Sequence, residues 1–148
     1  MKGRLLGVDY GVNRVGLAIC DPDRIIASPF ATYERNDTDT DAAYFRKVVA
    51  DERIVSIVVG LPIHTDGREG IKAKESRSYG AWLAGITGLP VQFWDERFST
   101  VQAESALWNA GLTHAKRKQR RDRVAAQMIL QAYIDAECPD NEGSGPLA

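Results

Sequence analysis

The run from Ile54 to Val59 constrains the fold more than any other segment of the chain. Its residues are Ile-Val-Ser-Ile-Val-Val, so apolar and mostly β-branched side chains would point to both sides of an extended chain. A strand with two apolar faces needs a covering layer on each side, which is typical of a parallel strand inside an α/β sheet. The segment therefore predicts a sheet with helices on both faces.

Three strands are predicted before this run. Arg4 to Tyr10 and Arg14 to Cys20 are rich in apolar residues and flank the turn Gly11-Val12-Asn13, a pattern typical of a hairpin. Ile25 to Tyr33 supplies a third strand. Pro29 within it indicates a sheet edge or a bulge, because proline cannot donate a ladder hydrogen bond.

Helices and one more strand follow. Apolar residues at three- and four-residue spacing predict helices at Ala42 to Asp51 and Ile71 to Ile86. The remaining predicted elements are a strand from Pro90 to Trp94, a helix from Ser99 or Thr100 to Ala110, and a helix from about Arg121 to Ala136. An antiparallel start followed by alternating helices and strands predicts an α/β fold with one mixed five-stranded sheet.

The chain has the size of one domain. Its 148 residues are 44% hydrophobic, enough for one buried core. We expect residues 1–137 to form this domain and the residues 138–148, rich in Pro, Gly and Ser, to form a flexible tail. The longest apolar run is too short to cross a bilayer, and the chain opens without a signal peptide, so a cytoplasmic protein is expected. Cys20 and Cys138 are expected to be free thiols.

A basic segment stands out in a chain whose net charge is −1. Six of the eight residues from Lys116 to Arg123 are Lys or Arg, and we expect them to form a loop before the last helix. A local basic patch on a nearly neutral protein suits a focused anionic ligand. A solvated, mobile loop is the alternative.

Acidic residues end the first and the last predicted strands. Asp9 closes Leu-Leu-Gly-Val-Asp, and Asp95-Glu96-Arg97 follows the last strand. Parallel strands end at the same edge of a sheet, where open α/β sheets bind their ligands. Neighbours on a regular strand point to opposite sides, so the sequence leaves open whether Asp95 or Glu96 faces Asp9. Turn or capping roles are the alternatives.

Asp122 is a third acid placed toward the interior. It lies three residues before Ala125 and seven before Ile129 of the last helix, which puts it on the apolar side of that helix. A carboxylate there is costly unless it is paired or binds a metal ion. An acid that stabilises the helix N-terminus is the alternative.

Three clustered carboxylates repel one another unless cations neutralise them. Carboxylate oxygens select hard ions such as Mg²⁺ or Mn²⁺, and two such ions about 4 Å apart can activate water and stabilise the leaving oxygen of a phosphodiester. A single ion is also compatible with three carboxylates. Asp9, Glu96 and Asp122 are therefore the predicted catalytic and metal-binding residues. The predicted substrate-binding residues are basic: Arg97, Lys116, Arg117, Lys118, Arg120 and Arg121.

Five stretches together resemble the YqgF-type family of RNase H-like nucleases. They are Gly-Val-Asp-Tyr-Gly-Val-Asn-Arg-Val-Gly-Leu-Ala (7–18), Ile-Val-Val-Gly-Leu-Pro (57–62), Asp-Gly-Arg-Glu-Gly (66–70), Asp-Glu-Arg-Phe-Ser-Thr (95–100) and Arg-Asp-Arg-Val-Ala-Ala-Gln-Met-Ile-Leu-Gln (121–131). The resemblance implies an RNase H-like fold and a cytoplasmic nuclease. That family is described both as maturing the 5′ end of pre-16S ribosomal RNA and as resolving Holliday junctions.

The motif positions match Asp9, Glu96 and Asp122 to the family's three acids. Ile63-His64-Thr65 departs from the Asn-Met-like residues common in that loop, which bears on substrate contacts rather than on the metal site. Ser99 stands where threonine is usual.

Two other classes of function share some of these features. An actin-like or sugar-kinase ATPase also follows its first strand with an Asp-x-Gly pattern and a hairpin, as Asp9 to Gly11 does, but such enzymes bind ATP between two domains. An RNA-binding scaffold without catalysis would have no use for clustered carboxylates.

An RNA substrate in ribosome biogenesis is the favoured reading, with branched DNA as the alternative. Symmetric cleavage of a four-way junction needs two active sites, and the sequence has no heptad seam for a stable dimer. We expect a monomer or weak dimer with a nucleic-acid partner and no membrane partner. Trp82, Trp94 and Trp108 are expected to be core or half-buried residues.

Overall fold

The computed structural model describes residues 2–98 and 114–139. Its elements in chain order are β1 (Arg4–Asp9), β2 (Arg14–Cys20), β3 (Ala27–Glu34), α1 (Thr38–Asp51), β4 (Ile54–Leu61), α2 (Ile71–Thr87), β5 (Val91–Asp95), the short 3₁₀ helix η1 (Glu96–Phe98) and α4 (His114–Asp135). No described helix is both long and apolar enough to span a membrane.

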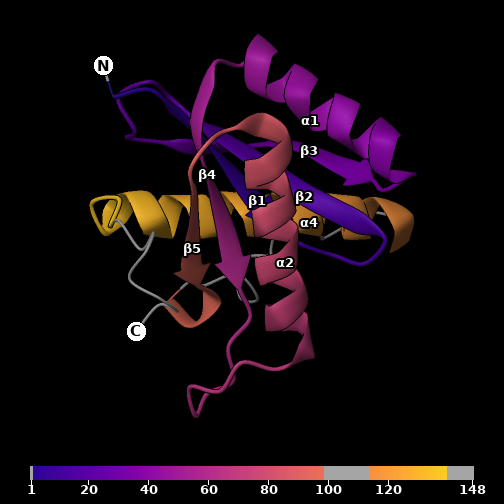
Figure 1. The fold of residues 1–148 in the computed structure, drawn as a ribbon. Coiled ribbons are helices and arrows are strands. Elements are labelled where there is room, and N and C mark those ends of the chain that lie inside the picture. The colour runs from indigo at the N-terminus through magenta and orange to yellow at the C-terminus, as the bar shows by residue number, and fades with distance from the viewer. Residues whose placement is uncertain (1, 99–113, 140–148) are drawn as a thin grey trace.

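The strands form one mixed sheet in the order β3-β2-β1-β4-β5. β1 pairs antiparallel with β2 and parallel with β4, and β4 pairs parallel with β5. Figure 1 shows α1 and α2 on one face of this sheet and α4 running across the other. The predicted five-stranded mixed sheet with helices on both faces is therefore confirmed.

Alternating side chains of the central strands build two cores. Leu6 and Val8 of β1 pack with Phe45 on the α1 and α2 side. Leu5, one residue earlier, packs with Leu130 of α4 on the other side. β4 is apolar on both faces for the same reason, since helices cover both of them.

β3 starts two residues later than the pattern predicts. The amides of Ile25 and Ile26 donate to Asp21 Oδ1 at 2.8 and 2.7 Å, which holds both residues in a turn with exposed side chains. Pro29 lies in the edge strand β3, beside a register shift at Leu17/Ala18. Both parts of the proline prediction hold.

α1 starts four residues earlier than predicted. The side chain of Asp37 caps it by accepting from the Thr40 amide at 2.8 Å. The first turn is mainly polar, so it adds little to the apolar pattern from which the helix was predicted.

The predicted basic loop is wrong, because α4 begins at His114 and includes residues 116–121. Lys, Arg, Gln and Ala are strong helix formers, and residues 114–136 contain no Gly or Pro. The buried stripe of the helix begins at Val124, so its polar start carried no apolar period. The predicted helix ending at Ala110 lies outside the described residues, as does most of the predicted tail.

Both cysteines are free, as predicted. Cys20 is buried in the core on the α4 side, and Cys138 packs against that same core from the far end of the chain.

Candidate carboxylate site

The three predicted acids lie at one edge of the sheet. Asp9 ends β1, Glu96 directly follows β5, and Asp122 lies on α4, which covers this face. Because β1, β4 and β5 are parallel, their carboxyl ends share that edge. Asp9 and Asp122 line one cavity of about 190 Å³, together with Arg14 and Lys72.

Gly60 separates Asp9 from Glu96. The residue before it, Val59, pairs with Val8 of β1, and Gly60 itself pairs with Trp94 of β5. A Cβ atom on Gly60 would lie 3.1 Å from Cγ and Oε2 of Glu96. The missing side chain thus leaves room for Glu96 to lie across the end of β4.

Asp9 and Glu96 form a carboxylate pair that the charge of Lys72 compensates only in part. Within residues 2–98 and 114–139, neither side chain takes part in a hydrogen bond or ion pair. Burial, and then the charge of Glu96, raise the pKa of Asp9 to about 8, although Lys72 lowers it. Burial also raises the pKa of Glu96. A bound cation would offset the cost of ionising these two buried, neighbouring carboxyl groups.

Asp122 has a partner. Its Oδ2 accepts from Arg14 Nε at 2.8 Å, and both side chains are partly buried. This ion pair joins the start of β2 to α4. The charge of Asp122 still contributes to the raised pKa of Asp9.

Lys72 was not predicted as a site residue. It lowers the pKa of both Asp9 and Glu96 through its positive charge. It lies in the first turn of α2, where the helix dipole disfavours a cation. A lysine at that position is the sequence signal that could have indicated an anionic neighbour.

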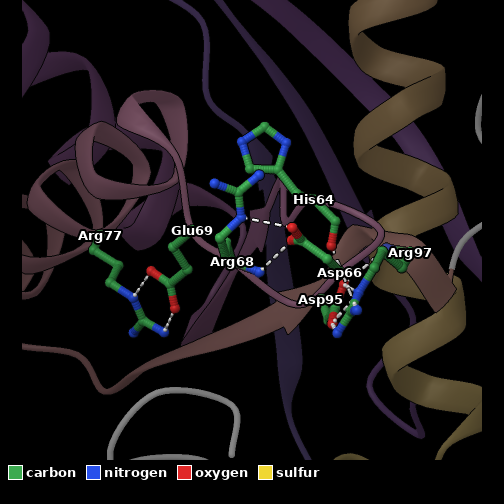
Figure 2. Close-up of polar contacts among 7 residues, drawn as sticks. All are labelled: His64, Asp66, Arg68, Glu69, Arg77, Asp95 and Arg97. Atoms are coloured by element: carbon green, nitrogen blue, oxygen red, sulfur yellow. Dashed lines mark hydrogen bonds and ion pairs between the residues drawn. The ribbon is translucent and has the colours of Figure 1, made fainter.

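Unlike Glu96, Asp95 has an ion-pair partner, which is Arg97. Its carboxylate is buried and accepts from Arg97 Nε at 2.9 Å, from Arg97 Nη2 at 2.5 Å and from the Arg97 amide at 2.9 Å. The turn of η1 after β5 therefore directs Glu96 toward Asp9. Arg97, a predicted substrate contact, is held beside Asp95 (Figure 2).

Two further ion pairs involve the loop between β4 and α2, and Figure 2 shows them together with the Asp95–Arg97 pair. Arg68 Nε donates to Asp66 at 2.6 Å, and Arg77 donates two bonds of 2.7 Å to Glu69. The His64 amide donates to the Arg68 carbonyl at 2.9 Å. The segment that departs from the family pattern therefore belongs to a loop that carries the exposed Arg68–Asp66 ion pair and that Glu69 ties to Arg77 of α2.

The other predicted substrate contacts all lie in the first two turns of α4, N-terminal to Asp122. Lys116 and Arg121 are exposed, and Arg120 is partly buried. Arg117 and Lys118 belong to the same helical segment. The basic residues thus share a helix with one of the acids.

The three acids offer the kind of ligand atoms that a hard divalent cation needs, but their side chains are not grouped closely enough to hold one. Asp9, Glu96 and Asp122 offer only carboxylate oxygens, which suit Mg²⁺ or Mn²⁺. Among the described residues, no three His, Cys, Asp or Glu side chains are grouped closely enough to hold an ion. The Asp122 carboxylate is instead paired with Arg14.

A protein-family model described as "RuvX: Holliday junction resolvase" matches residues 3–136. A Rhodopirellula baltica protein named "Putative pre-16S rRNA nuclease" is 50% identical over 134 residues, which cover 90% of this chain and 78% of that protein. A Koribacter versatilis protein with the same name is 39% identical over 142 residues, which cover 96% and 93%.

Two solved structures are similar in fold. One is Thermus thermophilus RuvC in complex with a Holliday junction substrate, with a TM-score of 0.57 and 16% identity over 90% of this chain and 96% of that one. The other is a fowlpox virus resolvase bound to junction DNA, with a TM-score of 0.56 and 13% identity over 92% and 99%. These likenesses confirm the predicted RNase H-like fold.

Proposed function

The chain belongs to the RuvX family of Holliday junction resolvases, and from this premise we propose that it is a metal-dependent nuclease that processes the 5′ end of pre-16S ribosomal RNA. One observation carries the proposal. Asp9 and Glu96 form a buried carboxylate pair at the sheet edge without a hydrogen-bond or ion-pair partner among the described residues, and Asp122 lines the same cavity as Asp9.

The three acids would hold Mg²⁺ or Mn²⁺. Asp9 and Glu96 offer oxygens that no described residue uses, and Asp122 would join them on leaving Arg14. When bound, such ions activate water and stabilise the leaving oxygen of a phosphodiester. Lys72 and the freed Arg14 lie on the same cavity, where their positive charges would hold the phosphate being cleaved.

Two substrates follow from the relatives. Proteins 39–50% identical carry the ribosomal-RNA nuclease name, which favours RNA. The family description favours a four-way junction as the second candidate. We also propose that the protein acts in the cytoplasm, as a monomer or weak dimer and without a membrane partner.

Parallel cleavage assays test the proposal. The protein is incubated with end-labelled precursor 16S rRNA and with a mobile four-way DNA junction, with Mg²⁺, Mn²⁺ or EDTA. We expect a defined cut in the RNA that needs the metal. Symmetric nicking of the junction with uncut RNA would support the resolvase instead, and cleavage of neither would reject both.

Asp122→Ala is expected to weaken Mn²⁺ binding at least ~10-fold and to lower cleavage with it, because a ligand is lost. Arg14→Gln is the matched variant, since it breaks the same ion pair but leaves the carboxylate. It should bind Mn²⁺ as well as the wild type or better. Calorimetry measures both affinities. Equal loss of thermal stability in the two variants, with Mn²⁺ affinity unchanged, would make Asp122 only a bridge to β2.

The basic start of α4 is expected to bind the backbone without regard to sequence. Replacing the exposed residues Lys116 and Arg121 by glutamine should reduce the slope of log affinity against log salt by ~0.7 per lost single-strand contact. Fluorescence anisotropy with two unrelated RNA sequences measures the slope, and Lys47→Gln on α1 is the control. An unchanged slope would show that these side chains are only solvated surface.

A further inference from the structure

A second cavity lies beside the one that Asp9 and Asp122 line, which we call the carboxylate cavity. The mechanism above does not use this second cavity. Its volume is about 490 Å³, within the range of small-ligand sites. We call it the aromatic cavity, after its lining residues Tyr10, Tyr79 and Trp82. Tyr10 lines both cavities, because it directly follows Asp9 at the end of β1. A polynucleotide held at Asp9 would pass the mouth of the aromatic cavity.

Tilted aromatic rings and one guanidinium group form part of the cavity wall. Arg35 lies 5.3 Å from the ring centroid of Tyr10 and 5.2 Å from that of Tyr79. The rings of Tyr79 and Trp82 lie 5.3 Å apart. Trp82 is only half-buried, as predicted, and so part of its indole remains available to a ligand. Nucleobases stack on such rings and on guanidinium planes.

One side of α2 forms the outer wall. Ile71, Lys74, Ser78 and Trp82 line the cavity, and their spacing of three or four residues places them on one helical stripe. The side chain of Ile71 is 79% exposed, so the core does not account for it. The cations Arg35 and Lys74 of the lining are balanced by the acids Asp41 and Glu75, which suits a flat, uncharged base whose phosphates stay outside.

Among the described residues, the hydroxyl group of Tyr79 has no hydrogen-bond partner. Tyr79 is 7% exposed, and its hydroxyl oxygen is buried without a hydrogen bond. Burial raises the pKa of this phenol, so the group keeps its proton and remains a donor. A base that enters the cavity far enough to reach this buried hydroxyl would supply an acceptor, either a carbonyl oxygen or a ring nitrogen.

We propose that the aromatic cavity binds one unpaired base of the substrate strand, next to the phosphodiester held at Asp9. A paired base could not enter, because its faces and edges are already used in the duplex. The inference rests on the proposed function for the identity of the strand, and it deepens that function by requiring single-stranded character near the cut.

The test compares two probes of equal charge. One is an oligoriboadenylate of roughly twelve nucleotides, and the other is a polymer of the same length whose sugars carry no bases. Binding is measured by fluorescence anisotropy in Ca²⁺. We expect the wild-type protein to bind the oligoriboadenylate about 10-fold more tightly, since stacking contributes ~1–3 kcal/mol per base. Equal affinities would overturn the proposal.

Two variants and one control locate the effect. Trp82→Leu should remove most of the preference for bases. Tyr79→Phe should reduce it about threefold without lowering the melting temperature, because it deletes an unsatisfied hydroxyl. If Trp82→Leu does not fold, the result for Tyr79→Phe decides the test. Tyr44→Phe, which alters a ring outside the cavity that stacks on Tyr33, should behave as wild type. The same preference in wild type and both variants would overturn the proposal.

Binding of bases and cleavage are read out separately. If the protein binds bases through Trp82 but cleaves neither RNA nor junction, the proposed nuclease fails and the cavity assignment stands. If it cleaves RNA but does not distinguish the two probes, only the cavity assignment fails.

Discussion

Asp9→Asn is expected to abolish phosphodiester cleavage and to raise the melting temperature of the metal-free protein. Activity should fall at least ~100-fold, because an ion ligand and its charge are lost. The variant should unfold about 3–10 °C higher near pH 8, equivalent to ~1–3 kcal/mol, because it no longer places a carboxylate beside Glu96.

The stability gain should depend on pH in a defined direction. The pKa of Asp9 is raised from 3.8 to about 8 on folding, so between these values the folded protein holds a proton that the unfolded chain releases. The free energy of unfolding of the wild type therefore falls as pH rises through this window. The Asn variant lacks that loss, so its advantage should be absent below pH ~4 and largest near pH ~8.

Asp135→Asn, at an exposed acid near the end of α4, is the control and should change neither property. Thermal scans from pH 4 to 9 in EDTA, together with cleavage assays in Mn²⁺, make the comparison. Full activity of purified Asp9→Asn would exclude Asp9 as a metal ligand. A difference in melting temperature that does not change with pH would exclude the electrostatic explanation.

Gly16→Ala is expected to destabilise the fold by about 3 kcal/mol, or ~10 °C, and to lower activity as well. A Cβ atom there would lie 1.9 Å from the backbone carbonyl oxygen of Asp122. Because the clash is with helix backbone rather than a mobile side chain, α4 would have to move away from β2. That movement would displace Asp122 from the carboxylate cavity.

Gly85→Ala provides the matched control. Gly85 lies in α2 at an exposed position, and a Cβ atom there would meet nothing within 4 Å. Removing a helical glycine should stabilise the protein by ~0.5–1 kcal/mol. Chemical denaturation measures both variants. If Gly16→Ala were as stable as the wild type, the close approach of β2 and α4 would be incorrect.

Local patterns in the sequence determined the architecture and one edge of the site. The two-faced apolar run at 54–59 predicted a covered parallel strand, and the short turn at 11–13 predicted the hairpin. Parallel strands end together, so the positions of Asp9 and the acidic pair at 95–96 followed from strand order alone. The continuous apolar run, the turn and the acids at strand ends are local signals, which are visible within a short window of sequence.

The starts of α1 and α4 were predicted too late in the chain. The polar turn at 38–41 and the basic turns at 114–121 are helical in the structure, yet neither carries an apolar period. A helix that extends past the core is stabilised by its own backbone bonds and by continuity with its buried part. The apolar pattern therefore shows where such a helix packs and not where it begins.

Only the tertiary structure decided which groups of the site meet. The turn of η1 directs Glu96 toward Asp9 and leaves Asp95 with Arg97. Arg14 reaches Asp122 across 108 residues of sequence, and Lys72 reaches the acids from α2. The aromatic cavity is assembled from β1, α1, α2 and the end of β3. Side-chain partners so far apart are set by how layers pack and where a glycine leaves room, which no local period encodes.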